Sequence, residues 1–210
     1  DVRAMTVDAG LAVAAYGSYY RAGEPAGPGN PDFRAVLETA QALGAPTIRV
    51  WCGQRGSTAA DTAYRQRVTA DLDRIGDLAG EAGILVAGEH HGGTLTDTDA
   101  SAKALYDSLA SPYVRPYWQP PGGLTVAACQ AGLEALLPTV CNLHVFTWDE
   151  VDGKRLRRPL AAGARRWLAW LGLAARTGRE HWALLEFVKD DSPAQLMEDA
   201  ATLNAWLAAL

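Results

Sequence analysis

Residues 46–53 read PTIRVWCG, a short run of apolar and β-branched residues that ends at a glycine. This composition is typical of a buried strand that stops at a turn. The preceding apolar residues are spaced by three and four, which indicates an amphipathic helix: Phe33, Val36, Leu37, Ala40 and Leu43. We expect this helix to end at Gly44, because glycine readily takes the left-handed conformation of a helix end.

The same unit of strand and helix recurs along the chain. Six apolar runs end in polar or aromatic residues: Leu11–Tyr20, Pro46–Gly53, Ile84–His91, Tyr113–Pro120, Cys141–Trp148 and Trp182–Val188. The segments between them have helical spacing, with expected helix boundaries at Gly83, at Asp97 or Thr98, and at Ser192-Pro193. Alternating strands and helices of this kind require a parallel sheet covered by helices, which leaves a doubly wound sheet or a (β/α) barrel.

The location of the polar residues favours the barrel. A dinucleotide-binding doubly wound sheet would show GxGxxG after its first strand, whereas residues 16–32 read YGSYYRAGEPAGPGNPD, a long loop with scattered glycines. A (β/α) barrel instead carries its functional residues at the carboxyl ends of several strands. This chain has its unusual polar and aromatic residues at those ends, so we predict a TIM-type barrel.

Composition excludes several classes of protein. The chain has 210 residues, 49% of them hydrophobic and 20% charged, which is ordinary for a soluble globular domain. No apolar stretch approaches the ~20 residues that cross a membrane. A net charge of -5 argues against nucleic acid as a partner, and the only dense basic stretch, residues 154–166, is interpreted as a solvated loop. The three cysteines have no disulfide or zinc spacing, so we expect a reducing, cytoplasmic location.

Acids, histidines and an amide occupy the ends of the later strands: Glu89, His91, Gln119, His144 and Glu186. Carboxylate, imidazole and amide oxygen are ligands for a divalent cation such as Mn²⁺, Mg²⁺, Co²⁺ or Zn²⁺. Aromatic rings at the same ends offer flat faces on which a sugar can rest. The pattern therefore indicates a metal-assisted site for a small polyol or sugar.

These segments resemble the xylose isomerase-like TIM barrels, a family of sugar phosphate isomerases and epimerases, and the resemblance extends over nearly the whole chain. It is carried by AYGSYYRAG, LGAPTIRVWCG, EHHGGTLTDT, YWQP, NLHVFTW and LLEFVKDDSP. The resemblance implies one divalent metal held by Glu89, Gln119, His144 and Glu186, with Gln119 standing where the family usually has Asp. It also implies that the catalytic residues Glu89 and Glu186 move protons on opposite faces of the sugar.

Each candidate also has a structural interpretation. Glu186 could form a buried ion pair with an arginine such as Arg49, His144 could be a core histidine, and Gln119 could bind metal, bind substrate or serve the fold. We expect His91 to face the same side as Glu89, because alternate residues of a strand share a face. The expected substrate-binding residues are His91, Trp51, Trp118, Trp148, Arg49 and Tyr20, although large aromatics at strand ends can also simply fill the barrel mouth. Trp167 and Trp170 have helical spacing and are assigned to packing.

The leading functional hypothesis is an isomerase or epimerase that removes a proton next to a carbonyl of a small sugar, sugar phosphate or hydroxy-ketone. A dehydratase that uses the same first step is a close alternative. The neutral Gln119 favours a third possibility, a non-catalytic carbohydrate-binding barrel. A multi-zinc DNA-repair nuclease is a poor alternative, since the chain has only four histidines.

The number of strands suggests that more chain precedes residue 1. A closed barrel of this kind has eight strands in ~250 residues, whereas six are predicted here. We expect a single barrel domain over residues 1–210, with two further units of strand and helix before it. Without them the first and last strands have open edges, which another segment or a second copy in a homo-oligomer would cover.

Overall fold

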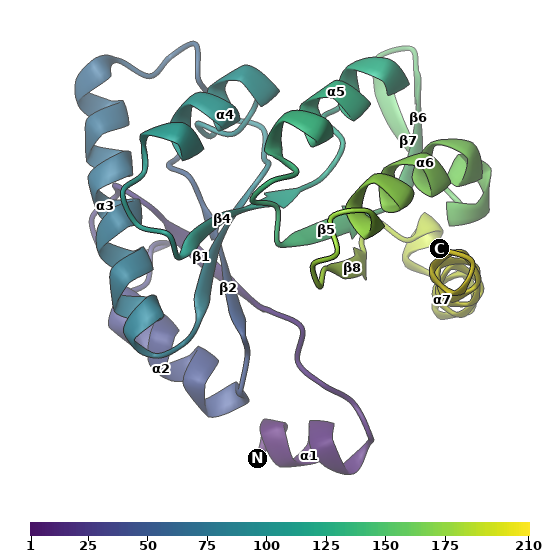
Figure 1. The fold of residues 1–210 in the computed structure, drawn as a ribbon, viewed down its shortest axis with the longest axis horizontal. Helices are drawn as coiled ribbons and strands as arrows, with labels where there is room; N and C mark the ends of the chain where they lie inside the picture. The colour runs from purple at the N-terminus through teal and green to yellow at the C-terminus, as the bar shows by residue number, and fades with distance from the viewer. The chain divides into compact units, whose positions relative to one another are not determined.

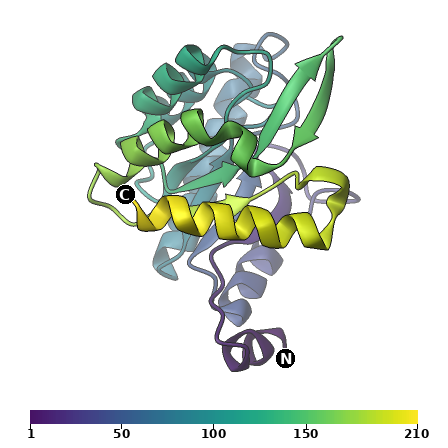
Figure 2. The same ribbon diagram turned by 90° about the vertical axis from the view of Figure 1, so that its right-hand side faces the viewer.

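The structure is a computed structural model that describes all of residues 1–210. Contacts within the chain divide it into two compact units, residues 1–117 and 118–210. Each unit is described by itself below (Figures 1 and 2). None of the helices combines the length and the apolar character that a membrane crossing needs.

Unit 1 alternates helices and strands throughout. Its elements are α1 (Val2–Asp8), β1 (Tyr16–Arg21), α2 (Phe33–Leu43), β2 (Thr47–Trp51), α3 (Thr62–Glu81), β3 (Leu85–Glu89), α4 (Asp99–Ser108) and β4 (Val114–Trp118), of which Trp118 belongs to unit 2. The strands are parallel and lie in the order β1-β2-β3-β4. Consecutive strands are therefore neighbours, as expected for a (β/α) barrel.

One face of this sheet forms the hydrophobic core of unit 1. Ile48, Val50, Val86 and Val114 point toward the helices and are buried. They pack against the apolar stripes of α2 and α3, which lie along the same side of the strands in Figure 1. Because strand side chains alternate, the residues between these four point to the opposite face.

Unit 2 contains the remaining parallel strands and a separate hairpin. Its elements are α5 (Val126–Leu136), β5 (Asn142–Val145), β6 (Thr147–Val151), β7 (Lys154–Arg158), the 3-10 turn Leu160–Gly163, α6 (Ala164–Ala175), β8 (Trp182–Leu185), the 3-10 turn Lys189–Asp191 and α7 (Pro193–Ala208). Strands β5 and β8 pair in parallel, and β6 pairs with β7 in antiparallel. The α6 and α7 helices are prominent in Figure 2.

The predicted number of six parallel strands is confirmed, since β1 to β5 and β8 account for all of them. The predicted helix ends are confirmed as well. Gly44 ends α2 with a φ of 70°, and Gly83 after α3 also has a φ of 70°. Thr98 caps α4, and Ser192 caps α7 with Pro193 in its first turn.

The hairpin of β6 and β7 was not predicted. The fifth strand was expected to extend to Trp148, whereas β5 ends at Val145 and Trp148 lies in β6. Asp152 and Gly153 both have positive φ, 51° and 71°, which is the backbone of a type I′ hairpin turn. The loop interpretation of residues 154–166 is therefore wrong, because 154–158 form β7, 160–163 form a 3-10 turn and 164–166 begin α6, although most of the basic residues in this stretch are exposed as expected. The Asp-Gly pair was the signal for this turn.

His90 makes the stability of unit 1 depend on pH. Its buried ring lies with Nε2 3.8 Å from Asp99 Oδ1, and burial lowers its pKa to about 4. In the unfolded chain the His90 imidazole is protonated below pH ~6.5, whereas in the folded chain it is protonated only near pH 4. The free energy of unfolding therefore falls as the pH drops from about 6.5 to about 4. We expect a loss of about 3 kcal/mol between these limits.

Urea unfolding followed by circular dichroism at neutral and mildly acidic pH measures this effect, with His90→Gln as the comparison. Burial raises the pKa of Asp99, which acts in the opposite direction, so the difference between the two proteins isolates the histidine. An equal pH dependence of stability in both proteins would contradict the assignment.

Candidate active site

Glu89 ends β3 and is the central acid of a strand-end cluster in unit 1. Its side chain is buried, and the residue is 4% exposed. The indole Nε1 of Trp51 donates a hydrogen bond of 2.7 Å to its Oε2, and Nη1 of Arg49 lies 3.2 Å from the same oxygen. The neighbouring β2 strand therefore supplies both the cation and the donor that compensate this buried carboxylate.

Several contacts fix the backbone that carries Glu89. Thr96 Oγ1 donates to the Glu89 carbonyl at 2.5 Å, and the Tyr106 hydroxyl donates to the Gly88 carbonyl at 2.8 Å. A Cβ atom at Gly88 would collide with the Tyr106 hydroxyl and Cys52 Sγ, so only glycine fits next to Glu89. Burial raises the pKa of Cys52 to about 12, which keeps it a neutral thiol rather than a metal-binding thiolate.

His91 joins this cluster while His90 does not. The centroids of the His91 and Trp51 rings lie 5.1 Å apart, and His91 Nδ1 donates to the Gly92 carbonyl at 2.7 Å. With Nδ1 occupied in this way, Nε2 is the ring nitrogen left to meet a ligand. His90 points toward Asp99 on the helix side, in agreement with the alternation expected of an extended chain.

Two of the predicted substrate-binding residues, Tyr20 and Trp118, do not belong to the cluster around Glu89. Tyr20 is buried on the helix side, where its hydroxyl donates to Asp71 of α3 at 2.7 Å. Trp118 is fully buried in unit 2, edge-on to Trp167 and Trp170. The tyrosine that does reach the cluster is Tyr19, 65% exposed and edge-on to Trp51 at 5.7 Å between ring centroids.

Arg115 of β4 was not predicted from the sequence as a site residue. It lies in β4, in register with Ala87 of β3, and therefore on the same face of the sheet as Glu89. A charged residue inside the otherwise apolar run YVRPYW was the available signal.

A second cluster lies at the strand ends of unit 2. His144 of β5 donates from Nδ1 to Gln119 Oε1 at 2.8 Å, and the same nitrogen lies 3.4 Å from Glu186 Oε2. Gln119 directly follows β4, and Glu186 directly follows β8, which pairs with β5. The structure thus brings together three of the four predicted metal ligands around one imidazole nitrogen.

The backbone next to Glu186 is strained. Phe187 has a φ of 52°, a left-handed conformation that costs a bulky residue on the order of 1–3 kcal/mol. Its ring packs against Phe146 and Trp148, with centroids 5.1 and 5.2 Å away. These contacts hold the turn in place immediately after the candidate acid.

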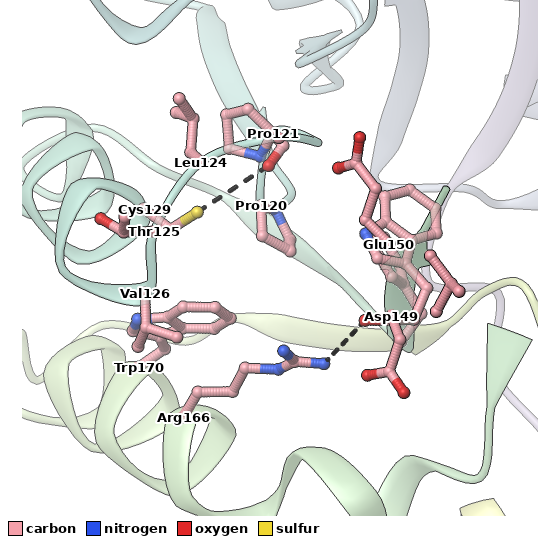
Figure 3. Close-up of a pocket in the computed structure, with 14 residues that line it drawn as sticks. Pro120, Pro121, Leu124, Thr125, Val126, Cys129, Asp149, Glu150, Arg166 and Trp170 are labelled. Atoms are coloured by element: carbon pink, nitrogen blue, oxygen red, sulfur yellow. Dashed lines mark hydrogen bonds between the residues drawn. The ribbon is translucent and has the colours of Figure 1, made fainter. Parts of the chain in front are cut away.

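Trp148 lies in a pocket of unit 2 with a volume of about 600 Å³ (Figure 3). Pro120 and Pro121 face Asp149 and Glu150 across it, and Arg166 of α6 extends into it. The guanidinium of Arg166 donates to the Trp148 carbonyl at 3.4 Å. The structure thus places Trp148 on a pocket wall formed by the hairpin.

The unit 2 cluster fits a divalent cation chemically. It offers one imidazole nitrogen, one carboxylate and one amide oxygen, all donors that Mn²⁺, Mg²⁺, Co²⁺ and Zn²⁺ accept. Ligation through Nδ1 requires the tautomer with its proton on Nε2, so an ion would replace the hydrogen bond to Gln119. The single carboxylate leaves this set with less negative charge than a typical site of two or more acids.

Comparison with solved structures defines the class to which this architecture belongs. The chain has the fold of the xylose isomerase-like TIM barrels, which confirms both the predicted fold and the resemblance seen in the sequence. Sequence comparison finds no matching protein-family model and no matching curated protein.

Three similar structures illustrate the class. A xylose isomerase-like TIM barrel protein from Mycobacterium smegmatis in complex with magnesium has a TM-score of 0.77 and 18% identity, covering 99% of this chain and 77% of that one. The probable 3-DHS dehydratase AsbF from Bacillus anthracis has a TM-score of 0.76 and 18% identity, covering 95% and 78%. An L-ribulose 3-epimerase has a TM-score of 0.66 and 14% identity, covering 96% and 71%.

Proposed function

We propose that this chain is a metal-dependent isomerase or epimerase that acts on a small sugar, sugar phosphate or hydroxy-ketone. The observation that carries the proposal is the grouping of Gln119 and Glu186 around Nδ1 of His144 at the strand ends of unit 2. Strand ends are where barrel enzymes place their chemistry. The similar structures, which include an epimerase and a magnesium complex, support the same class of activity.

Glu89 completes the proposed ligand set. Glu89 is the last residue of β3, and His144 likewise lies near the end of β5. In a closed barrel the carboxyl ends of the parallel strands meet at one rim. We propose Gln119, His144, Glu186 and Glu89 as the residues that hold the ion. The bound cation would act as a Lewis acid that stabilises negative charge on the sugar oxygens.

The two glutamates are the proposed proton carriers. One carboxylate would accept the proton on the carbon next to the carbonyl, and the other would return a proton to the neighbouring carbon or to the opposite face. Trp51 and Arg49 hold the Glu89 carboxylate in one orientation, which suits a group that must meet a fixed C–H bond. No feature of either cluster favours loss of water, so we do not propose a dehydratase.

A carbohydrate-binding barrel without catalysis is the second candidate. The observation in its favour is the neutral Gln119, which satisfies His144 by a hydrogen bond and needs no ion to do so. In that case Tyr19, Trp51 and His91 would contact a sugar without any proton transfer.

One experiment separates the two candidates. The purified protein is incubated in D₂O with Mn²⁺ and a panel of ketoses and hydroxy-ketones, and mass spectrometry detects deuterium next to the carbonyl. An isomerase or epimerase exchanges this hydrogen, and the exchange stops when the metal is chelated. Sugar binding without exchange, together with no bound divalent ion after metal addition, would support the binding protein instead.

Gln119→Asp tests the metal set directly. The variant adds a negative charge next to His144 and Glu186, so we expect it to bind Mn²⁺ about 10-fold or more tightly than the wild-type protein. Isothermal titration calorimetry measures the affinity. Gln41→Asp, at an exposed position of α2, makes the same charge change as a control. An affinity unchanged in Gln119→Asp would show that residue 119 does not touch the ion.

A further inference from the structure

Three arginines lie on the face of the unit 1 sheet that points away from the helices. Arg49 is in register with Gly17 on one side and with Ala87 on the other, and Ala87 is in register with Arg115. Arg21 is in register with Trp51, which in turn is in register with Glu89. Residues in register share a face, so Arg21, Arg49 and Arg115 all point to the side where TIM barrels usually place apolar residues.

The space around Arg49 is shaped for its guanidinium. Both of its register neighbours, Gly17 and Ala87, are small. A Cβ atom at Gly17 would lie only 3.3 Å from Arg49 Nη2, tighter than an ordinary contact. The guanidinium carbon also lies 5.4 Å from the Trp51 ring centroid and 5.9 Å from that of Tyr19. These contacts hold a planar cation in one place.

Arg21 is held against the same indole. Its guanidinium carbon is 4.7 Å from the Trp51 ring centroid, and its Nη1 donates to the Gly29 carbonyl. Two guanidinium groups therefore lie close to one tryptophan ring. Arg115 lies two strands from Arg49, a Cα separation of about 10 Å given the usual strand spacing, with the small Ala87 between them.

The charges of this face do not balance. Three arginines share it with one acid, Glu89, and the ion pair of this face joins Arg49 to that acid. The excess of positive charge is local, because the whole chain has a net charge of -5. Like charges on neighbouring strands repel each other, so an anion bound between these arginines would lower their mutual repulsion.

We propose that the substrate of this site carries an oxyanion, a carboxylate or a phosphate, that binds to Arg49 together with Arg21 and Arg115. The planar donors of arginine match the oxygens of both groups. The inference rests on the proposed function, and among the sugars, sugar phosphates and hydroxy-ketones named there it selects substrates that carry an anionic group, including sugar acids. Glu89 then faces the reacting end of a molecule whose anionic end is held by arginine.

Three five-carbon probes test the proposal: neutral D-ribulose, D-ribulose 5-phosphate and D-ribonate. Isothermal titration calorimetry measures their binding to the wild-type protein and to Arg49→Gln, Arg21→Gln and Arg115→Gln. We expect at least one anionic probe to bind more tightly than D-ribulose, and the variants to weaken it by about 10- to 100-fold each. The phosphate and carboxylate probes show which oxyanion the site prefers.

Arg34→Gln is the matched control, because it removes one positive charge at an exposed position of α2. Its affinity for the anionic probes should equal that of the wild-type protein. Arg49→Gln removes the partner of a buried acid and could fail to fold, whereas Arg21→Gln and Arg115→Gln leave the pair of Arg49 with Glu89 intact. The loss of anion binding can therefore be measured in these two variants even if Arg49→Gln does not fold.

The outcomes separate this inference from the proposed function. Equal binding of all three probes, no binding of either anion at millimolar concentration, or anion binding that no arginine variant weakens would overturn the inference. If D-ribulose still undergoes metal-dependent deuterium exchange in that case, the proposed function stands alone. Arginine-dependent anion binding without any exchange would leave the inference standing and remove the isomerase.

Discussion

Glu186→Gln is expected to lower turnover by about 10²- to 10⁴-fold, the range that a lost general acid or base produces. Gln has nearly the same size as Glu but cannot accept the proton. The carboxylate it replaces lies 3.4 Å from Nδ1 of His144, so we also expect weaker Mn²⁺ binding. Deuterium exchange measured with the substrate that the panel identifies gives the rate, and calorimetry gives the metal affinity.

Glu180→Gln is the matched control, because Glu180 is exposed and precedes β8. This variant should keep the wild-type rate and metal affinity. Glu89→Gln should lose turnover to a similar degree if Glu89 is the second proton carrier. A Glu186→Gln protein that exchanges deuterium at the wild-type rate would exclude Glu186 as an acid or base.

Trp167→Ala is expected to destabilise the chain by about 3–5 kcal/mol, the usual cost of removing a large aromatic from a core. Trp167 of α6 is fully buried, with ring centroids 5.0 Å from Trp170 and 6.3 Å from Trp118. Its Nε1 donates to the Phe146 carbonyl at 2.7 Å, and the variant leaves this carbonyl without its donor. Urea unfolding followed by circular dichroism measures the loss.

Leu168→Ala is the control on the same helix, since Leu168 is 39% exposed and should cost far less. A loss of this size could leave Trp167→Ala unfolded, because small proteins are stable by only ~5–15 kcal/mol. Trp167→Phe keeps part of the ring and should show a smaller, measurable loss. Equal effects of Trp167→Phe and Leu168→Ala would argue that the aromatic core matters less than its burial implies.

Local signals predicted most of the fold. Helical spacing, Gly44 and Gly83 at helix ends, and the caps at Thr98 and Ser192 all depend on residues close together in sequence, and all are present in the structure. The hairpin at residues 147–158 was not predicted, although the pair Asp152-Gly153 is typical of a two-residue hairpin turn. β7 is polar and mostly exposed and β6 ends in exposed residues, so the two strands lack the continuous apolar run that identified the other six.

The direction of individual side chains was harder to predict. Tyr19 and Tyr20 are adjacent at the end of one strand and therefore point to opposite faces, but nothing local shows which of them faces the helices. The Asp71 carboxylate of α3, 51 residues away, binds the Tyr20 hydroxyl and settles the choice. Trp118 is likewise a core residue, because Trp167 and Trp170 of α6 pack edge-on against its ring.

The sequence by itself determined the order of the six parallel strands and their helices, because this order depends on periodicity along the chain. It also placed Glu89, Gln119, His144 and Glu186 at strand ends, and the location of these polar residues favoured the barrel over a doubly wound sheet. Only the tertiary structure decided that Gln119 and Glu186 meet at one nitrogen of His144, and that Arg49 pairs with Glu89. The register of β2 with β3 and of β5 with β8 sets the contacts of Arg49 with Glu89 and of His144 with Glu186, and it aligns residues that are tens of positions apart in the chain.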